Sequence, residues 1–200
     1  MRACGQPPGG LTSANLVEIE RALIATAVDR AGAGVARLTH PELDAAFRRS
    51  EYRLTAVQAA ALRTIATSGD GVDVIEALAG TGKTYTAGAI RALCETPGYT
   101  VVGVAPTGRA ARELVEQAGV AARTLDSQLL SIDAGWGLPE RSVVIFDEAA
   151  MASTRQSARL LEHAAGRGVK VVAIGWAAPV GSRGRLDARD WPARRSGPPD

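Results

Sequence analysis

Residues 77–84 of this 200-residue chain read Ala77-Leu-Ala-Gly80-Thr81-Gly82-Lys83-Thr84. They match the pattern Gly-x-x-x-x-Gly-Lys-Ser/Thr, with alanine in place of the first glycine. Two glycines near the end of the loop allow the backbone to curl, so that successive N–H groups point inward at phosphate oxygens. Lys83 then brings a positive charge to the β- and γ-phosphates, and Thr84 offers a hydroxyl to Mg²⁺. The segment therefore predicts a loop that binds ATP and Mg²⁺. A plain glycine-rich turn would require neither Lys83 nor Thr84.

The residues around this loop alternate between strand and helix patterns. The loop itself follows a short apolar strand and precedes a helix, the context that a phosphate-binding loop needs. From Leu54 onward we expect helices at 55–66, 83–93, 108–118, 126–131 and 158–165, and strands at 72–77, 100–105, 143–147 and 170–174. Repeated strand–helix–strand units predict an α/β fold with a parallel sheet flanked by helices. The expected strand at 143–147 is apolar on both faces, which indicates a sheet that is covered on each side.

An acidic pair follows one of these strands, in the sequence Val143-Val-Ile-Phe-Asp147-Glu148. In an open parallel sheet, ligands bind at the carboxyl ends of the strands. Asp147 would hold Mg²⁺ there, usually through water, and Glu148 would act as general base on the attacking water. Alone, the pair could also be two solvated carboxylates that open the next loop. Together with Lys83, it predicts a catalytic centre made of Lys83, Asp147 and Glu148.

Composition divides the chain into three regions. Residues 1–50 are expected to form a disordered start followed by a helical lead-in, in which Asn15 and Glu18 resemble a capping box and His40-Pro41 opens a second helix. Residues 51–176 carry the α/β pattern. Residues 177–200 are rich in Pro, Gly and Arg without periodicity, so we expect a disordered tail. The abrupt change at Trp176 looks like a reading-frame shift or an eroded gene end.

The net charge of +2 comes from the tail, which holds five Arg and three Asp, so DNA binding must be argued from motifs and not from bulk charge. No uncharged apolar run approaches the roughly 18 residues that span a bilayer. The N-terminus lacks the apolar stretch of a secretory signal. Two cysteines, Cys4 and Cys94, are too few for a disulfide framework. These features favour a cytoplasmic protein without a membrane segment.

Several further segments, taken in order, resemble the motifs of superfamily 1 DNA helicases. These segments are Leu54-Thr-Ala-Val-Gln58, Ala79-Gly-Thr-Gly-Lys-Thr84, Val104-Ala-Pro-Thr107-Gly-Arg109-Ala-Ala111, Thr124-Leu125 and Asp147-Glu-Ala-Ala-Met151. Their order and spacing resemble the RecD-like branch, and more narrowly the helicase part of MobF-class conjugative relaxases of the TraA/TraI type. The resemblance covers roughly residues 12–175 and implies a P-loop NTPase domain with the RecA-like fold.

The resemblance also implies roles for individual residues. Gln58 would read adenine, and the loop residues Ala79, Gly80, Thr81, Gly82, Lys83, Thr84 and the following Tyr85 would bind the nucleotide. Thr107 and Arg109, with Thr124 and Ser127 nearby, would contact single-stranded DNA, since hydroxyl and guanidinium groups both suit phosphate. The alternative from the residues alone is that Arg109 begins a helix and stays solvated, and that Gln58 is a surface residue.

The sequence departs from this family after Val171-Val-Ala-Ile-Gly175. The family continues with an acidic residue and then a glutamine that senses the γ-phosphate, whereas this chain continues with Trp176-Ala-Ala-Pro. A second RecA-like domain with its arginines and a histidine-rich relaxase domain are also expected and not found in the sequence. We therefore expect a truncated fragment that hydrolyses ATP slowly and cannot unwind DNA alone. Its partners in the full-length family would be single-stranded DNA and other conjugation proteins.

Two other functions fit part of the sequence. The chain could be a stand-alone ATP-binding switch or partner module that uses its tail for docking. It could also be a P-loop small-molecule kinase, although such kinases place arginines in a lid after the core, and no folded lid is visible in the sequence.

Overall fold

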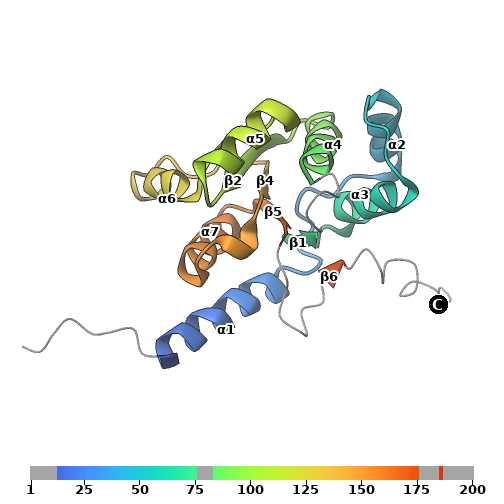
Figure 1. The fold of residues 1–200 in the computed structure, drawn as a ribbon. Helices are drawn as coiled ribbons and strands as arrows, with labels where there is room; N and C mark the ends of the chain where they lie inside the picture. Colours follow the sequence, from blue (N-terminus) through green and yellow to red (C-terminus); the bar gives the residue numbers. More distant parts are fainter. Residues whose placement is uncertain (1–12, 76–82, 176–184, 187–200) are drawn as a thin grey trace, which may run out of the picture.

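A parallel β-sheet forms the centre of the protein (Figure 1). The structure is a computed structural model and describes residues 13–75, 83–175 and 185–186. The strand order is β3-β2-β4-β5-β1-β6, and every pair in it is parallel. The strands are β1 (Val72–Ile75), β2 (Thr100–Ala105), β3 (Ala121–Thr124), β4 (Ser142–Phe146), β5 (Lys170–Ile174) and β6 (Arg185–Leu186).

The two central strands explain why the sheet is buried on both faces. Every residue of β4 and of β5 is buried, as the apolar run at 143–147 predicts. Strands of a parallel sheet that are covered on both sides consist largely of Val, Ile and similar residues. The α/β fold with a parallel sheet flanked by helices is therefore confirmed.

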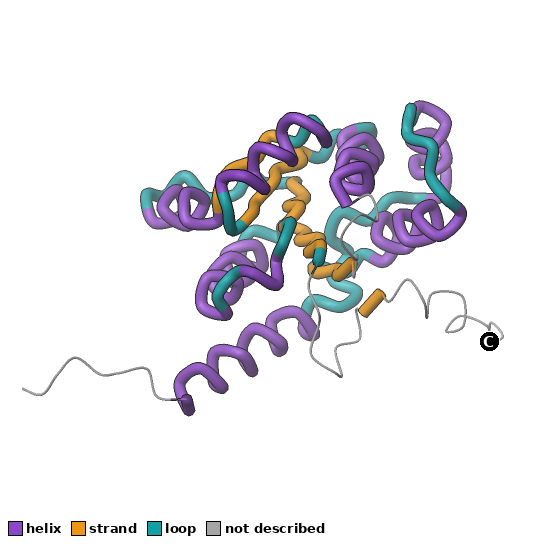
Figure 2. The backbone as a smooth tube through the Cα atoms, in the orientation of Figure 1, coloured by secondary structure: helices purple, strands orange, loops and turns teal. Residues whose placement is uncertain are grey.

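Helices cover the two faces of this sheet (Figure 2). One face packs against α2 (His40–Arg49), α3 (Ala56–Ser68), α4 (Lys83–Glu95) and α5 (Gly108–Ala118). The other face packs against α1 (Ser13–Asp29), α6 (Leu125–Asp133) and α7 (Thr154–Gly166), with a short 3₁₀ turn at Ala149–Met151. Two separate apolar cores result, one on each side of the sheet.

Most expected elements lie within a few residues of their observed bounds. The strand β2, the helix α5 and the strand β5 have the expected bounds. The expected capping box at Asn15 is wrong, because α1 already begins at Ser13 and the Asn15 side chain accepts a hydrogen bond from Arg155 Nη2 on α7 at 2.6 Å. The strand β3 was not expected, since only alternate residues of its short sequence are partly buried.

The lead-in helices belong to the same two cores as the sheet. α1 packs along α7, and Leu23 of α1 is 6% exposed. α2 packs on α3 and α4 through Leu43 and Ala46, which are buried. Thr39 caps α2 with a capping box that it forms with Glu42. The lead-in therefore covers the sheet on both sides and does not form a separate unit.

A buried ion pair fastens β1 to β5. Lys170 Nζ lies 2.6 Å from Asp73 Oδ2 and donates to the carbonyl oxygen of Ile65, the residue near the end of α3, at 2.7 Å. Burial raises the pKa of the Asp73 carboxyl to about 6, although the neighbouring Lys170 ammonium acts to lower it. Sequence patterns could not predict this pair, because each residue stands alone within an apolar strand.

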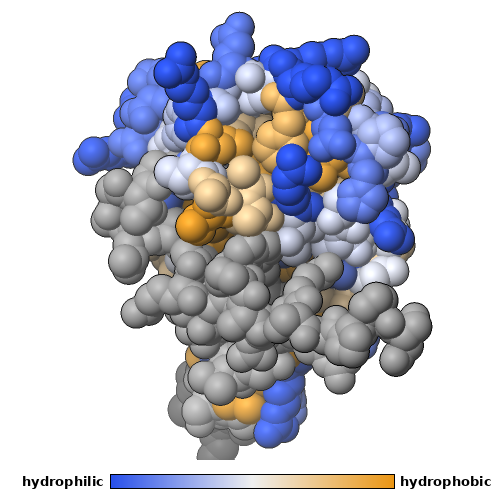
Figure 3. Space-filling view, turned by 90° about the vertical axis from the view of Figure 1, so that its right-hand side faces the viewer, coloured by the Kyte–Doolittle hydropathy of each residue, from blue (hydrophilic) through white to orange (hydrophobic). Residues whose placement is uncertain are grey.

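Two residues of the tail belong to the described structure. Residues 185–186, inside the stretch expected to be disordered, pair with Val74 and Ile75 as the two-residue strand β6. The rest of 177–200 lies outside the described residues. Figure 3 shows the side of the molecule where α2 and α3 lie, and there hydrophilic residues lie above and beside a smaller apolar area.

Candidate functional site

The expected phosphate-binding loop joins β1 to the first residue of α4. Ala79, Gly80, Thr81 and Gly82 lie outside the described residues, whereas Lys83 and Thr84 form the first turn of α4. Both of these side chains are partly buried. Lys83 and Thr84 are thus the first described residues after the carboxyl end of β1, a strand of the parallel sheet. This is the strand–loop–helix arrangement that the sequence predicts.

Lys83 extends over the end of β5, where Gly175 adopts a left-handed conformation with φ 75°. Lys83 Nζ lies 3.3 Å from the point where a Cβ on Gly175 would stand, and Glu148 Cα lies 3.9 Å from the same point. The Gly175 N–H donates to the carbonyl oxygen of Ile75, the last residue of β1, at 2.9 Å. The glycine thus leaves room for the ammonium group next to the acidic pair. The role of Gly175 is not visible in the sequence, because it comes from a contact with a residue 92 positions away.

Asp147 is fixed at the end of β4 by its own backbone. Its N–H donates to the Val104 carbonyl oxygen on β2 at 2.9 Å, and its Oδ1 accepts from the Glu148 N–H at 2.9 Å. The side chain is almost fully buried, and this burial raises the pKa of the Asp147 carboxyl. The Glu148 hydrogen bond and the Lys83 charge oppose that rise. Asp147 directly precedes Glu148, whose Cα lies, like the Lys83 ammonium, within 4 Å of the point where a Cβ on Gly175 would stand.

Glu148 has a strained backbone. Its φ of 50° and ψ of 34° lie in the left-handed region, which residues with a Cβ rarely adopt. Such strain persists only where the surrounding structure imposes it, and it concentrates at functional sites. Here the strand turns sharply after Asp147, and the turn continues with a hydrogen bond from the Met151 N–H to the Glu148 carbonyl oxygen at 2.9 Å. The three residues expected to act in catalysis are therefore gathered at one edge.

Gln58 lies in the first turn of α3 and belongs to a capping box. Its Oε1 accepts hydrogen bonds from the Thr55 backbone N–H at 3.0 Å and from the Thr55 hydroxyl at 3.3 Å. The Thr55 hydroxyl oxygen accepts from the Gln58 N–H in return. The pairing engages the amide oxygen, whereas the Nε2 group, a pair of N–H donors, takes no part in it. Gln58 therefore has a structural role in capping α3, whatever else it binds.

Tyr85 links the first turn of α4 to the segment that leads into α3. Its hydroxyl accepts a hydrogen bond from the Arg53 backbone N–H and donates to the Arg53 carbonyl oxygen at 3.3 Å. Its ring also meets Tyr52 edge to face, with centroids 5.0 Å apart. Tyr52 in turn lies so close to Gly88 of α4 that any side chain there would collide with its hydroxyl. Through these contacts, the segment that carries Gln58 is fastened to the helix that carries Lys83.

The residues expected to contact DNA lie at the carboxyl ends of β2 and β3. Ala105 of β2 pairs with Thr124 of β3, so that Thr124 lies beside the strand end that leads to Thr107. Both threonines cap helices: the Thr107 hydroxyl accepts from the Ala110 N–H and the Thr124 hydroxyl from the Ser127 N–H, each at 3.2 Å. Each hydroxyl keeps its own O–H for donation.

Arg109 is the most exposed of these residues. Its side chain is 86% exposed, and its Nε lies 2.9 Å from Glu113 Oε1 one turn along α5. The hydrogen bond and charge of Glu113 raise the pKa of the Arg109 guanidinium. The charge of Glu148 acts on this pKa in the same direction, as a smaller influence. An exposed ion pair of this kind contributes little to stability, so the guanidinium is available to another anion at small cost.

The described part of the chain holds neither a metal-binding cluster of side chains nor a membrane-spanning helix. Among residues 13–75, 83–175 and 185–186, no group of three or more His, Cys, Asp or Glu side chains is arranged to hold a metal ion. Mg²⁺ at a phosphate site usually takes only one or two carboxylates and completes its coordination with phosphate and water. No described helix has the length and apolar character required to cross a bilayer.

Comparison with known proteins identifies the family. Residues 53–179 match the family model described as AAA domain. The chain is 35% identical over 172 residues to a probable conjugal transfer protein TraA of Sinorhizobium fredii, which covers 84% of this chain and 15% of that protein. It is 38% identical over 148 residues to a conjugal transfer protein TraA of Rhizobium radiobacter, covering 74% of this chain and 13% of the relative.

A third such relative comes from Agrobacterium fabrum and is 36% identical over 124 residues, which is 62% of this chain. The chain thus spans about one seventh of the length of the curated relatives that it matches. The family match covers more than half of the chain and includes the loop, Gln58 and the acidic pair. The chain therefore belongs to the AAA domain family, a helicase-like family of P-loop proteins, and is homologous to the conjugal transfer protein TraA.

Proposed function

We propose that these residues form the ATP-binding and ATP-hydrolysing domain of a conjugative relaxase-type DNA helicase. The observation that carries this proposal is the position of Lys83 Nζ, which lies against Gly175 and beside Glu148 at the carboxyl edge of the sheet. The similarity to conjugal transfer proteins supports the conjugation context.

The residues at this edge fit ATP and Mg²⁺ by their chemistry. They include an ammonium, the Thr84 hydroxyl at the start of a helix and the buried carboxylate of Asp147. The N-terminus of α4 adds N–H groups and a positive helix-dipole end, which favour phosphate. When bound, Mg²⁺ would neutralise the negative charge that develops on the γ-phosphate. Thr84 and Asp147 would hold this ion, Asp147 through water, and Lys83 would hold the β- and γ-phosphates.

Glu148 is the proposed general base. Its left-handed backbone directs the residue away from the line of β4, next to the site of the Lys83 ammonium. A carboxylate at this place would accept a proton from the water that attacks the γ-phosphate. Asp147 cannot serve both purposes well, because its Oδ1 already accepts the Glu148 N–H.

The adenine end of the nucleotide would lie toward α3. Gln58 has its Oε1 engaged by Thr55, so its amide N–H groups would donate to an adenine ring nitrogen. Tyr85 would contribute to the same site by fastening the segment before α3 to α4. Ala79, Gly80, Thr81 and Gly82 complete the proposed nucleotide contacts from the loop outside the described residues.

Single-stranded DNA is the proposed second ligand. Thr107, Arg109 and Thr124 would contact its phosphates. Thr107 and Arg109 follow the end of β2, and Thr124 ends the neighbouring strand β3, so that two hydroxyl groups and a guanidinium belong to adjacent strand ends. We further propose that these 200 residues, tested by themselves, bind ATP, turn it over slowly and do not unwind a duplex. Translocation requires two domains that close on one nucleotide, and an arginine finger accelerates hydrolysis by about 10³–10⁵-fold.

A binding experiment tests this proposal. Binding of a fluorescent ATP analogue with Mg²⁺ is measured for the wild-type chain, for Lys83→Ala and for Arg112→Ala, an exposed basic residue on α5 that serves as control. Lys83→Ala should abolish binding, whereas Arg112→Ala should leave it unchanged. Unchanged binding by Lys83→Ala would remove the main assignment.

The same measurement with oligo-dT separates the alternatives. Binding of ATP that becomes tighter or weaker when oligo-dT is added indicates the helicase function. ATP binding that ignores oligo-dT indicates a stand-alone switch or partner module, and transfer of phosphate to a metabolite indicates a kinase. Unwinding of a duplex by the 200 residues alone would contradict the proposal that they form an incomplete helicase.

A further inference from the structure

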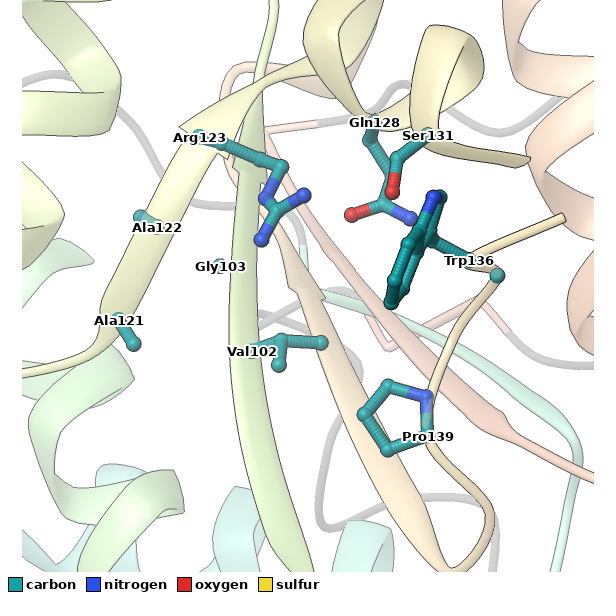
Figure 4. A pocket seen from close by; sticks show the side chains of 10 residues that line it. Val102, Gly103, Ala121, Ala122, Arg123, Gln128, Ser131, Trp136 and Pro139 are labelled. Carbon is teal, nitrogen blue, oxygen red and sulfur yellow. The ribbon is translucent and has the colours of Figure 1, made fainter. Parts of the chain in front are cut away.

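A pocket lies on the face of the sheet that α6 covers, away from the carboxyl edge. Its volume is about 500 Å³, within the range of pockets that hold small ligands. Figure 4 shows that its floor is formed by β2 and β3, and its other walls by α6 and the loop before β4. It is lined by Val102, Gly103, Ala121, Ala122, Arg123, Gln128, Ser131, Trp136, Gly137 and Pro139. The site proposed above uses none of these residues.

An unpartnered amide points into this pocket. Gln128 of α6 is only 5% exposed, and within the described residues its buried Nε2 group has no hydrogen-bond partner. Figure 4 shows this amide directed into the cavity next to the Ser131 hydroxyl. A buried N–H donor without a partner is costly, and native structures rarely keep one without a reason. A ligand with an acceptor oxygen would satisfy it.

In contrast to the buried Gln128, Trp136 is 82% exposed. Its position is nevertheless fixed, because its backbone N–H donates to the Ser131 carbonyl oxygen at 2.9 Å. Two residues later, the Leu138 N–H donates to His163 Nε2 on α7 at 3.1 Å, and Leu138 itself is buried. The loop therefore presents a large flat ring to solvent from an ordered backbone. Such a ring is suited to stacking against another flat ring.

The charged and polar side chains of the pocket indicate which kind of ligand ring would bind there. Arg123 reaches toward the cavity from the side opposite Trp136 (Figure 4). The lining residues include this one basic side chain and no carboxylate. An exposed aromatic ring, a guanidinium and an amide donor together suit a planar base with carbonyl oxygens that is attached to a phosphate. A cationic or purely apolar ligand would leave the amide or the guanidinium without a partner.

We propose that this pocket binds one base of a single-stranded nucleic acid. The base stacks on Trp136, a base carbonyl oxygen accepts from Gln128 Nε2, and Arg123 faces the adjoining phosphate. This inference rests on the DNA engagement proposed above and adds a second contact to it. β3 runs from the pocket at Ala121 to Thr124 at the carboxyl edge, a distance of about 10 Å at the usual rise per residue. One strand of DNA can therefore reach both places.

Tryptophan fluorescence provides a direct test. The chain has three tryptophans, so the substitutions Trp176→Phe and Trp191→Phe leave Trp136 as the only one. Adding oligo-dT should quench its emission, because stacked bases quench an indole ring. In a polarisation assay with labelled oligo-dT, Trp136→Ala should weaken binding by about 5- to 150-fold, the range for the loss of one base–aromatic stack. Leu130→Ala, at a 69% exposed residue on α6 outside the pocket, should leave it unchanged.

Gln128→Leu distinguishes ligand binding from a structural role. It replaces the unpartnered amide with an apolar group of similar size, so the Tm should stay the same or rise while oligo-dT binding weakens. The loss should be smaller for oligo-dA, because adenine has no carbonyl oxygen. A lower Tm with unchanged oligo-dT affinity would show that the amide only supports the fold, and it would overturn the proposal.

The outcomes also separate this inference from the proposed function. If the chain binds oligo-dT but Trp136 is not quenched and Trp136→Ala has no effect, the pocket proposal fails and the proposed function stands. If the chain binds no oligo-dT with or without ATP, the DNA part of both proposals fails. Quenching together with weaker binding in both pocket variants supports the pocket as a base-binding site.

Discussion

Lys170 on β5 and Asp73 on β1 form an ion pair that is almost inaccessible to water, with Nζ 2.6 Å from Oδ2 and side-chain exposures of 2% and 3%. Removing one partner leaves the other charge buried alone. We expect Asp73→Leu to lower the free energy of unfolding by about 3–5 kcal/mol. The double variant Asp73→Leu with Lys170→Met should recover most of this loss. Urea unfolding followed by circular dichroism measures both, and a double variant as unstable as the single one would contradict the explanation.

The same pair makes stability depend on pH. The pKa of Asp73 is about 6 in the folded chain, above its ordinary value of 3.8, because burial disfavours the charged carboxylate. Between these values the folded state retains a proton that the unfolded state has released, so this residue's contribution to stability is present below pH 4 and is lost as pH rises through 6. The difference in unfolding free energy between wild type and the double variant should therefore fall by about 3 kcal/mol at most from pH 4 to 7. A difference that stays constant over this range would show that Asp73 does not titrate there.

Gly175→Ala should weaken ATP binding strongly, in addition to the loss of stability that a side chain causes at a positive φ. The new methyl group would lie 3.3 Å from Lys83 Nζ, and the left-handed backbone at this position disfavours any side chain. Displacing the ammonium should lower affinity for the fluorescent ATP analogue by tenfold or more, because a misplaced charged group loses most of its contact energy. Gly168→Ala is the matched control, since Gly168 also has a positive φ, of 62°, and a Cβ there meets nothing within 4 Å. Equal affinity in both variants would show that Lys83 does not act from this position.

Glu148→Gln should separate binding from turnover. The amide keeps the size of the side chain but cannot accept the proton of an attacking water. We expect ATP binding to remain and phosphate release to fall by about 10²-fold or more, the usual contribution of a general base. Glu116→Gln, at an exposed acidic residue on α5, controls for the loss of one charge. Turnover that survives in Glu148→Gln would assign the base to another group.

Tyr85→Phe tests the connection between the two segments that we propose to bind the nucleotide. The variant loses the hydrogen bonds to the Arg53 backbone but keeps the ring that packs on Tyr52. We expect a loss of about 0.5–1.5 kcal/mol in stability. Affinity for the ATP analogue should fall in parallel if Gln58 takes part, because its segment is then held less firmly. If Tyr85→Phe lowers stability but leaves the affinity for the ATP analogue unchanged, Tyr85 has only a structural role.

The fold could be predicted because its strongest signals are local. The bounds of three elements could be predicted to the residue. β2 and β5 are marked by apolar runs, and α5 by its amphipathic pattern. β3 was missed because its sequence, Ala-Ala-Arg-Thr, has few β-branched residues and no fully buried position. Its strand conformation depends on pairing with β2, and such a contact is not visible in four residues.

Candidate site residues could be named from the sequence where a motif carries its own chemistry, and their roles stay predictions. Lys83, Asp147 and Glu148 were expected from residue types and order, and the structure brings them together. Gly175, Tyr52 and Gln128 were not expected, since each matters through a neighbour distant in sequence. A glycine, a tyrosine and a glutamine are too common to be noticed without that neighbour.

The family match begins at residue 53, but both apolar cores include side chains that lie earlier in the chain. A shorter chain cut at that point would lose Leu23, Leu43 and the Arg30 guanidinium, which donates to the Val169 carbonyl oxygen at 2.6 Å. Two apolar surfaces, one on each face of the sheet, would then be exposed to solvent. We therefore expect a protein that begins at residue 53 to be poorly soluble, and one that retains α1 and α2 to stay in solution.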